Sequence, residues 1–537
     1  MSATANPPSW IDTVFQLGVK RSALLQQLIL LDRQHNEVIP IGQLPAEVLS
    51  LIFHYLINRD WSTTWNVQRS VQYRRSESEL EFVVTASHIC HRWREIALQD
   101  PTLWTLWSTF EFRSNLWLQK VKERTQSSLL TFRIALYLKP SGIAALKTHA
   151  SCIRTLEVGL DDTITTITHL DNPLPHLESL SIFSFAPPSS SYRRQSWSSD
   201  SLLPETTFSG NAPCLSTVSI ISVLVDLRLP IFVNVVNLSI SDIRLDLEDL
   251  ARHFTEGLKA MRRLESLTLS HSVLGEVTHT IPLPELRQLK IKGRLHPFSK
   301  LLTKLRTTPT CSIHLTFSIK SDDPVGAELM GEYIARTTED YPIDLAETRW
   351  AITLNHKSLE IGYRMNQLEG PRFFLMLQRS RHSKPTLPLH IAIPTLLAPL
   401  LSRIPSYELC QNSDMHKKSV LMASEIVELL FEQRTVTSIG FNGAIAFFEA
   451  VPHLVRHAQS GGRTFNVYLP SLRTVQLKNI PMNTPEAKEK TVHVLKLRAE
   501  GGSPIQVVDL VSCDGAMLMA KSLREEFKDL DVGVRNS

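Results

Sequence analysis

The chain has 537 residues, of which 43% are hydrophobic and 20% are charged, and its net charge is +4. This length exceeds the needs of one ordinary domain, and the composition is normal for a soluble globular protein. The weak positive charge, without a basic run longer than two residues, gives no support for nucleic-acid or anionic-membrane binding.

The chain shows no sign of export or membrane insertion. Its first eight residues, MSATANPP, contain neither a basic nor an apolar segment, so no signal peptide is predicted. The most apolar stretch, residues 390–404, is interrupted by Pro394, Pro399 and Arg403 and falls short of a membrane span. Six scattered cysteines without a C-x-x-C pair favour reduced thiols. We therefore expect a cytoplasmic or nuclear protein.

Residues 10–39 predict an N-terminal helix. Leu17, Leu24 and Leu31 recur every seven residues, and Leu28 lies alongside them. Two heptads are too few for a coiled coil. The pattern therefore favours a helix that packs on the module that follows it.

Residues 40–107 predict three short helices. Pro45 suits a first helical turn, where its missing N–H costs nothing. The first helix then carries one apolar stripe, made of Val48, Leu51, Ile52, Tyr55 and Leu56. A second helix repeats the spacing at Ala86, Ile89, Cys90, Trp93 and Ala97. Asp100 and Pro101 predict the N-cap and first turn of a third helix that holds Leu103 and Trp104.

Three short helices cannot bury this much apolar surface against one another. Leu44, Phe53, Trp93 and Trp104 are therefore candidates for insertion into a partner's groove, because large anchors dominate such contacts. The alternative is that these are ordinary core helices of a larger helical domain.

The residue string of this region resembles an F-box. Its three pieces occur in order, as Leu-Pro-x-Glu-x-Leu-x-x-Ile-Phe at 44–53, Ile-Cys-x-x-Trp-Arg at 89–94 and Pro-x-Leu-Trp at 101–104. The resemblance implies a module that binds a Skp-type adaptor of a ubiquitin ligase. By resemblance, the adaptor-binding residues are Leu44, Pro45, Val48, Leu49, Ile52, Phe53, Ile89, Cys90, Trp93, Leu103 and Trp104. An insert at 58–80 departs from the family, which has a short turn there.

Residues 108–513 repeat the phrase apolar-x-x-apolar-x-apolar, with polar residues at each x. Full copies begin at residues 153, 177, 215, 264, 286 and 472, and looser copies span 235–240, 436–441 and 492–497. When the looser copy at 235–240 is included, the central apolar positions from the first copy to the one at 286 are 24, 38, 20, 29 and 22 residues apart. All but one of these spacings lie in the leucine-rich-repeat range of roughly 20–29 residues. The region resembles a degenerate leucine-rich-repeat array.

This array departs from a regular one in several ways. The Asn or Cys expected three positions after each phrase is missing, for example at Val223, Ser272 and Ile480. The Ser/Pro-rich stretch 184–213 predicts a disordered loop and accounts for the longest spacing. Residues 320–435 contain no convincing copy and are either divergent repeats or a separate insertion. Residues 514–537 are expected to form a C-terminal cap.

The predicted fold class is therefore α/β, with an N-terminal three-helix F-box followed by an irregular leucine-rich-repeat-like α/β solenoid. The whole is similar to the large F-box family of mushroom-forming fungi. We find no catalytic string and no metal-ligand set, since His453 and His457 lack a third ligand nearby in sequence. We therefore expect no enzyme activity and no cofactor.

The leading functional hypothesis is a substrate-recognition adaptor of an SCF-type cullin–RING ubiquitin ligase. Its partners would be a Skp-type adaptor, through it the cullin–RING ligase, and an unknown protein substrate. Candidate substrate-binding residues are the polar members of the phrases, namely Ser266, Thr268, Gln288, Lys290, Arg473 and Gln476. The alternatives are an F-box scaffold acting outside ubiquitination, an enzyme hidden in 320–435, and a decayed family copy.

Overall fold

The structure is a computed structural model. It describes residues 10–57, 80–108, 114–134, 140–160, 171–184, 206–245, 248–275, 277–308, 310–319, 324–340, 349–354, 358–364, 373–379, 401, 406–410, 430–431, 433–444, 447–448, 454–457 and 465–535. The insert up to residue 79 and residues 185–205 of the Ser/Pro-rich stretch lie outside this description. The chain divides into two compact units, Met1–Leu215 and Ser216–Ser537.

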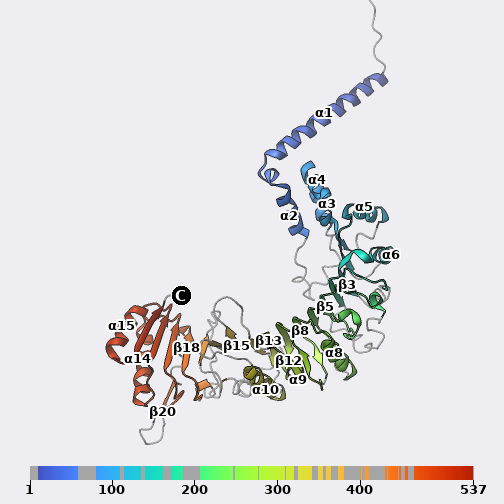
Figure 1. The fold of residues 1–537 in the computed structure, drawn as a ribbon. Coiled ribbons are helices and arrows are strands. Elements are labelled where there is room, and N and C mark those ends of the chain that lie inside the picture. The colour runs from blue at the N-terminus through green and yellow to red at the C-terminus, as the bar shows by residue number, and fades with distance from the viewer. Residues whose placement is uncertain are drawn as a thin grey trace, which may run out of the picture. The chain divides into compact units, whose positions relative to one another are not determined.

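The first unit begins with helices (Figure 1). They are α1 (Trp10–Val38), η1 (Pro40–Gln43), α2 (Ala46–Ile57), α3 (Leu80–Ile89), α4 (His91–Gln99) and η5 (Pro101–Trp104). Pro45 accepts the first backbone hydrogen bonds of α2, from the N–H groups of Val48 and Leu49, both at 3.1 Å. Pro101 opens η5, and the Asp100 side chain accepts a hydrogen bond from the Thr102 N–H at 3.0 Å. The predicted N-cap and the third helix are therefore confirmed.

The predicted second helix was wrong as a single element. Cys90 has an extended backbone (φ −155°, ψ 169°), and this residue separates α3 from α4. The break turns α4 so that the Trp93 ring packs against Phe53 of α2, with 5.2 Å between ring centroids. Helical spacing continued through Cys90 in the sequence, so the pattern alone gave no sign of this break.

The N-terminal helix α1 forms where the sequence predicts it, but it is exposed along nearly its whole length. None of its residues is buried, and Leu17, Leu24, Leu28 and Leu31 are each more than half exposed. The expected packing of this helix on the F-box was therefore wrong. Apolar residues occur all round α1, so it has no single face that the module could bury.

A parallel sheet completes the first unit. Its strands are β1 (Leu106–Ser108), β2 (Leu130–Ile134), β3 (Ile153–Leu160) and β4 (Ser179–Ser184), paired in that order. Helices α5 (Asn115–Thr125) and α6 (Pro140–Thr148) and the short helix η7 (Ala150–Cys152) lie between them, and the short helix η10 (Thr207–Gly210) follows β4. Alternate side chains of β2 are buried, including Phe132, whose ring lies 5.3 Å from that of Trp107.

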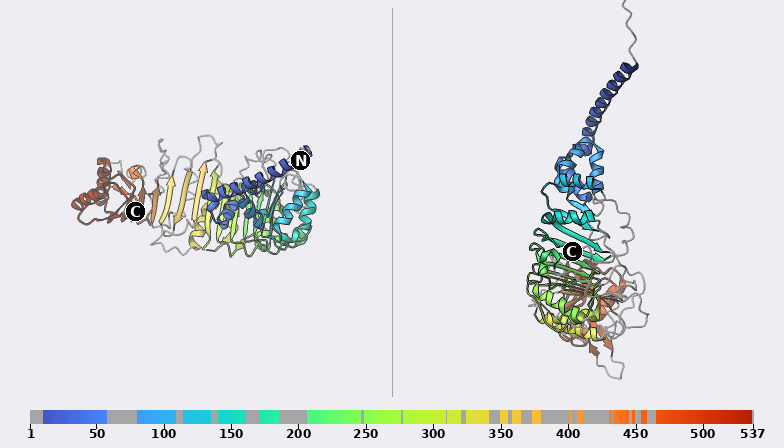
Figure 2. Two further views of the ribbon diagram at one scale, coloured as in Figure 1. Left: turned by 90° about the horizontal axis from the view of Figure 1, so that it is seen from above. Right: turned by 90° about the vertical axis from the view of Figure 1, so that its right-hand side faces the viewer.

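The second unit is built on strands that lie side by side (Figure 2). The first set pairs in parallel from each strand to the next and consists of β5 (Thr217–Ile221), β6 (Asn237–Ser241), β8 (Ser266–Ser270), β11 (Gln288–Arg294), β13 (Ser312–Ile319) and β16 (Phe373–Arg379). The last are β17 (Ser406–Cys410), β18 (Ser438–Asn442), β21 (Thr474–Lys478), β22 (Val507–Val511) and β23 (Asp531–Arg535), again parallel.

Between these two parallel sets the pattern changes. β15 (Ser358–Arg364) pairs antiparallel with β16 on one side and with β14 (Arg349–Leu354) on the other. β14 then pairs in parallel with β17. An antiparallel segment thus lies within residues 320–435, the region in which the sequence showed no repeat phrase.

Helices and short elements connect the strands of the second unit. They are η11 (Pro230–Phe232), β7 (Arg244–Leu245), α8 (Glu248–Ala260), β9 (Val273–Leu274), β10 (Ile281–Leu283), α9 (Leu295–Lys304), β12 (Leu305–Thr307), α10 (Pro324–Asp340), β19 (Val455–His457), β20 (Phe465–Val467), α14 (Pro485–Glu500) and α15 (Ala516–Glu526). In Figure 1, α8, α9 and α10 lie along the lower side of their strands. Apolar strand residues such as Leu267, Leu289 and Ile313 are fully buried.

One backbone pattern recurs at the ends of the strands. The residue after the strand has a left-handed conformation, with φ of 50–59°, at Ser222, Asp242, His271, Asn479 and Ser512. Each of these residues donates its backbone N–H to a carbonyl oxygen of the next strand, at 2.6–3.1 Å. The acceptor is the last residue of that strand except for His271, which donates to Lys292 of β11. The strand turns are therefore held by backbone bonds at this position, and a side-chain ladder of Asn is not needed there.

The buried Arg498 fastens α14. Its side chain donates hydrogen bonds to the carbonyl oxygens of Tyr468 at 2.6 Å and Leu469 at 2.9 Å. Burial lowers the pKa of this guanidinium to about 10.

None of the helices in the described part of the chain combines the length and the apolar character that a membrane span requires.

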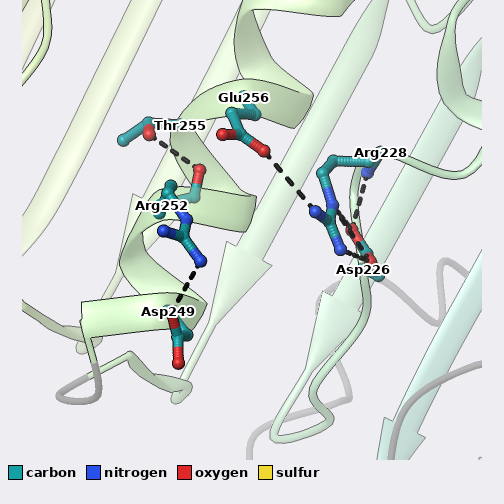
Figure 3. Close-up of polar contacts among 6 residues, drawn as sticks. All are labelled: Asp226, Arg228, Asp249, Arg252, Thr255 and Glu256. Atoms are coloured by element: carbon teal, nitrogen blue, oxygen red, sulfur yellow. Dashed lines mark hydrogen bonds and ion pairs between the residues drawn. The ribbon is translucent and has the colours of Figure 1, made fainter.

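The helix α8 lies unusually close to the loop before η11. Figure 3 shows Arg228 in this loop, which pairs with Asp226 at 2.7 Å and reaches Glu256 of α8 at 3.5 Å. A Cβ atom at Gly257 would lie 2.3 Å from the Leu227 Cβ and 2.6 Å from its carbonyl carbon. Glycine at this position therefore permits the close approach.

Replacing Gly257 with alanine is expected to destabilise the protein by about 1–3 kcal/mol, because the added methyl group must push the loop and the helix apart. The free energy of unfolding in urea, followed by circular dichroism, measures this loss. Gly18→Ala is the matched control, since nothing lies within 4 Å of that helical position. Equal stability of the two variants would contradict the prediction.

Candidate functional site

The helix α2 has one face in the protein and another in solvent. Leu49, Phe53 and Ile57 are buried beneath it. On the other side, Leu51 is 67% exposed and Tyr55 is 82% exposed. Val48 and Leu56 are also exposed, and Ile52 is half-buried. The apolar stripe predicted from spacing therefore faces outward, and we call Val48, Leu51, Ile52, Tyr55 and Leu56 the α2 stripe.

A shallow groove runs beside this stripe. Its lining comes from α2, the end of α4 and the start of η5, and comprises Ala46, Glu47, Ser50, Leu51, His54, Ile96, Gln99, Asp100 and Pro101. Most of its exposed surface is apolar, and its lining includes the polar residues Ser50, His54 and Asp100. A partner could therefore bury apolar groups here and still find hydrogen-bonding groups.

Asp100 connects the polar residues of the groove. It accepts a hydrogen bond from the Ser50 hydroxyl at 2.5 Å and lies 3.2 Å from the His54 Nε2. Partial burial alone would raise the pKa of Asp100. The hydrogen bonds from Ser50 and Thr102 and the nearby His54 outweigh burial, so this pKa lies below its ordinary value.

This lowered pKa gives a testable pH dependence. A carboxyl whose pKa falls on folding stabilises the protein above its unfolded pKa of about 3.9, and the contribution is lost as the pH falls through the folded pKa. The stability difference between the wild type and Asp100→Asn is therefore expected at pH 6 and should shrink below about pH 4. Tryptophan-detected urea unfolding between pH 6 and 3 measures it. A constant difference over this range would contradict the assignment.

The structure divides the predicted adaptor contacts into two groups. Leu49, Phe53, Leu103 and Trp104 are at most 2% exposed and form the core of the module. Because they are buried in the module itself, they pack beneath its surface and are not available to contact the adaptor. The outward or half-exposed members are Leu44, Pro45, Val48, Ile52, Ile89, Cys90 and Trp93.

Three contacts brace the F-box-like segment, one at the half-exposed Leu44 and two at the buried Trp104. The Arg92 side chain donates a hydrogen bond to the Leu44 carbonyl oxygen, which ties the segment before α2 to α4. The Trp104 indole N–H donates to the Ala97 carbonyl oxygen at 2.7 Å, and the Arg124 guanidinium lies 4.2 Å from its ring. Leu51 and Tyr55 were absent from the predicted contacts. Their signal is the apolar spacing of the first predicted helix, near which only Leu44 and Phe53 are predicted as anchors.

The predicted substrate-binding residues belong to the second unit, and all but Arg473 lie on its strands. Ser266 and Thr268 of β8 are in register with Gln288 and Lys290 of β11. The Ser266 hydroxyl donates to the Gln288 side-chain oxygen at 3.4 Å. These four residues therefore form one surface.

Arg473 and Gln476 belong to a different part of the second unit. Arg473 is exposed just before β21, whereas Gln476 is only 8% exposed and has Gly440 and Asp509 as its strand neighbours. A side chain this enclosed offers little contact area, so Gln476 is not proposed as a substrate contact. Among the described residues, no group of three or more His, Cys, Asp or Glu could hold a metal ion.

Comparison with known protein families supports the interpretation of this chain as an F-box protein. Residues 41–106 match the F-box-like family, and this match spans the helices α2 to η5 with the groove described above. No curated protein matches the chain. An F-box-like domain indicates, in general, a role in substrate recognition by SCF ubiquitin ligases. Such domains generally bind the Skp adaptor, and their proteins are typically adaptors rather than enzymes.

Proposed function

We propose that this chain is the substrate-recognition subunit of an SCF-type cullin–RING ubiquitin ligase. Its F-box binds a Skp-type adaptor, and the second unit binds a protein substrate. Catalysis of ubiquitin transfer belongs to other subunits. The observation that carries this proposal is the α2 stripe, an apolar surface presented to solvent within the F-box-like segment.

An outward apolar helix face of this kind favours a protein partner. Leu51 and Tyr55 expose adjacent apolar surface to water. A contiguous exposed apolar patch on a protein marks a surface that another molecule covers. Large side chains at the centre of a surface are also the usual hot spots of an interface. Leu44, Pro45 and Val48 extend the same surface along the segment that carries the family pattern.

For the second unit we propose a degenerate leucine-rich-repeat-like solenoid. The recurring left-handed turn after its strands supports this, because the same backbone unit is reused at each step. Parallel strands with alternate buried residues also fit stacked repeats. The antiparallel segment β14–β16 would then be an interruption of the array.

Co-purification with a Skp-type adaptor and a cullin tests the proposal. A complex that contains all three proteins supports a ligase subunit. A complex with the adaptor that excludes the cullin favours the alternative, an F-box scaffold acting outside ubiquitination. Failure of the wild-type chain to bind any Skp-type adaptor would overturn the proposed function.

A further inference from the structure

One strand of the second unit carries three positive charges on its exposed face. The burial of β11 alternates, so that Leu289, Ile291 and Gly293 are buried while Lys290, Lys292 and Arg294 are exposed. The buried face is covered by α9, because a Cβ atom at Gly293 would lie 2.5 Å from the Phe298 ring. The three cations therefore point away from the helix layer.

The strands on either side add three hydroxyl groups and one imidazole to this face. Thr268 of β8 and His314 of β13 flank Lys290, and Ser270 and Thr316 flank Lys292 in the same way. No Asp or Glu occupies the outward-facing positions of β5, β6, β8, β11 or β13. Within the described residues, none of the three β11 cations forms an ion pair. The surface is thus positive and rich in hydrogen-bonding groups.

We propose that Lys290, Lys292 and Arg294 form a docking strip for an extended acidic segment of the substrate protein. The chemistry that fits the strip is a chain with Asp or Glu at alternate positions. Side chains two residues apart in an extended chain lie about 6.6–6.8 Å apart on one face, which matches the spacing of the three cations on β11. The flanking hydroxyl groups supply donors to carboxylate oxygens.

Charge and shape favour an acidic peptide over a nucleic acid. Three cations on one strand neutralise few phosphates, whereas nucleic-acid binding normally uses many. The outward positions of β5, β6, β8, β11 and β13 also include no Phe, Tyr or Trp, the rings on which bases mainly stack, and His314 is their one aromatic side chain. This inference rests on the proposed substrate-recognition role and names the chemistry of the substrate.

Fluorescence anisotropy with the full chain tests the strip. The probe is a labelled peptide with Glu at three alternate positions in an alanine background, and the competitors are its Lys counterpart and single-stranded oligothymidine. We expect the Glu peptide to bind, and to bind more weakly at high salt. Lys290→Glu/Lys292→Glu is expected to weaken binding about tenfold or more, because two attractions become repulsions.

Two further variants keep the test decisive. Lys300→Glu/Lys304→Glu makes the same charge change on α9, which covers the opposite face, and should leave binding near the wild-type value. Lys290→Gln/Lys292→Gln removes the charges without reversal and should give an intermediate loss. Unchanged binding in both β11 variants, absence of binding to the wild type, or stronger binding to oligothymidine would overturn the inference.

The outcome is separable from that of the proposed function. A chain that binds the Skp-type adaptor but not the acidic peptide overturns only the docking strip. A chain that binds the peptide through β11 but no adaptor overturns only the ligase role.

Discussion

Replacing Leu51 and Tyr55 together with aspartate is expected to weaken binding to the Skp-type adaptor by at least about thirtyfold. Loss of one interface hot spot typically costs 2 kcal/mol or more, and here the partner would also have to bury new charges. Isothermal titration calorimetry with the purified adaptor measures the change. Stability should hardly change, because both side chains lie mostly in solvent.

The matched control is Leu518→Asp on α15, a 75% exposed leucine in the second unit. It introduces the same chemistry at a comparable exposure and should leave adaptor affinity unchanged. Wild-type affinity in the Leu51→Asp/Tyr55→Asp variant would show that the adaptor does not use the α2 stripe. A similar loss in the Leu518→Asp control would show that the effect is not specific to the F-box.

Replacing Trp104 with alanine is expected to destabilise the first unit by about 3–5 kcal/mol, because a large buried ring is lost and a cavity remains. The Ala97 carbonyl oxygen also loses its hydrogen bond from the indole. Urea unfolding followed by tryptophan fluorescence measures this effect. The signal reports chiefly on the first unit, since every tryptophan except Trp350 precedes residue 216.

Two variants separate core packing from adaptor contact at this position. Trp10→Ala removes a 76% exposed tryptophan from α1 and should leave stability unchanged. Trp104→Phe keeps most of the buried ring and should retain adaptor binding wherever the protein is folded. Loss of adaptor binding by Trp104→Phe at wild-type stability would instead mean that the ring contacts the partner.

The contrast between Leu51 and Trp104 shows how far the sequence could predict the site. Spacing identified one apolar stripe on α2, and the motif identified the anchors, but neither showed which residues face inward. On a short helix with apolar residues on both sides, the neighbouring elements decide which side is buried. Here Leu49 and Phe53 are buried, with the Trp93 ring of α4 against Phe53, while Leu51 and Tyr55 lie in solvent.

The sequence by itself determined the presence and order of the F-box pieces and the alternation of the repeat phrases. Both depend on local spacing, which a single chain records directly. Only the tertiary structure showed the break at Cys90, the outward α2 stripe, the antiparallel β15 and the alignment of Lys290 with Thr268. These features depend on which distant segments meet, because strand register and helix burial are set by packing between elements rather than by local propensity.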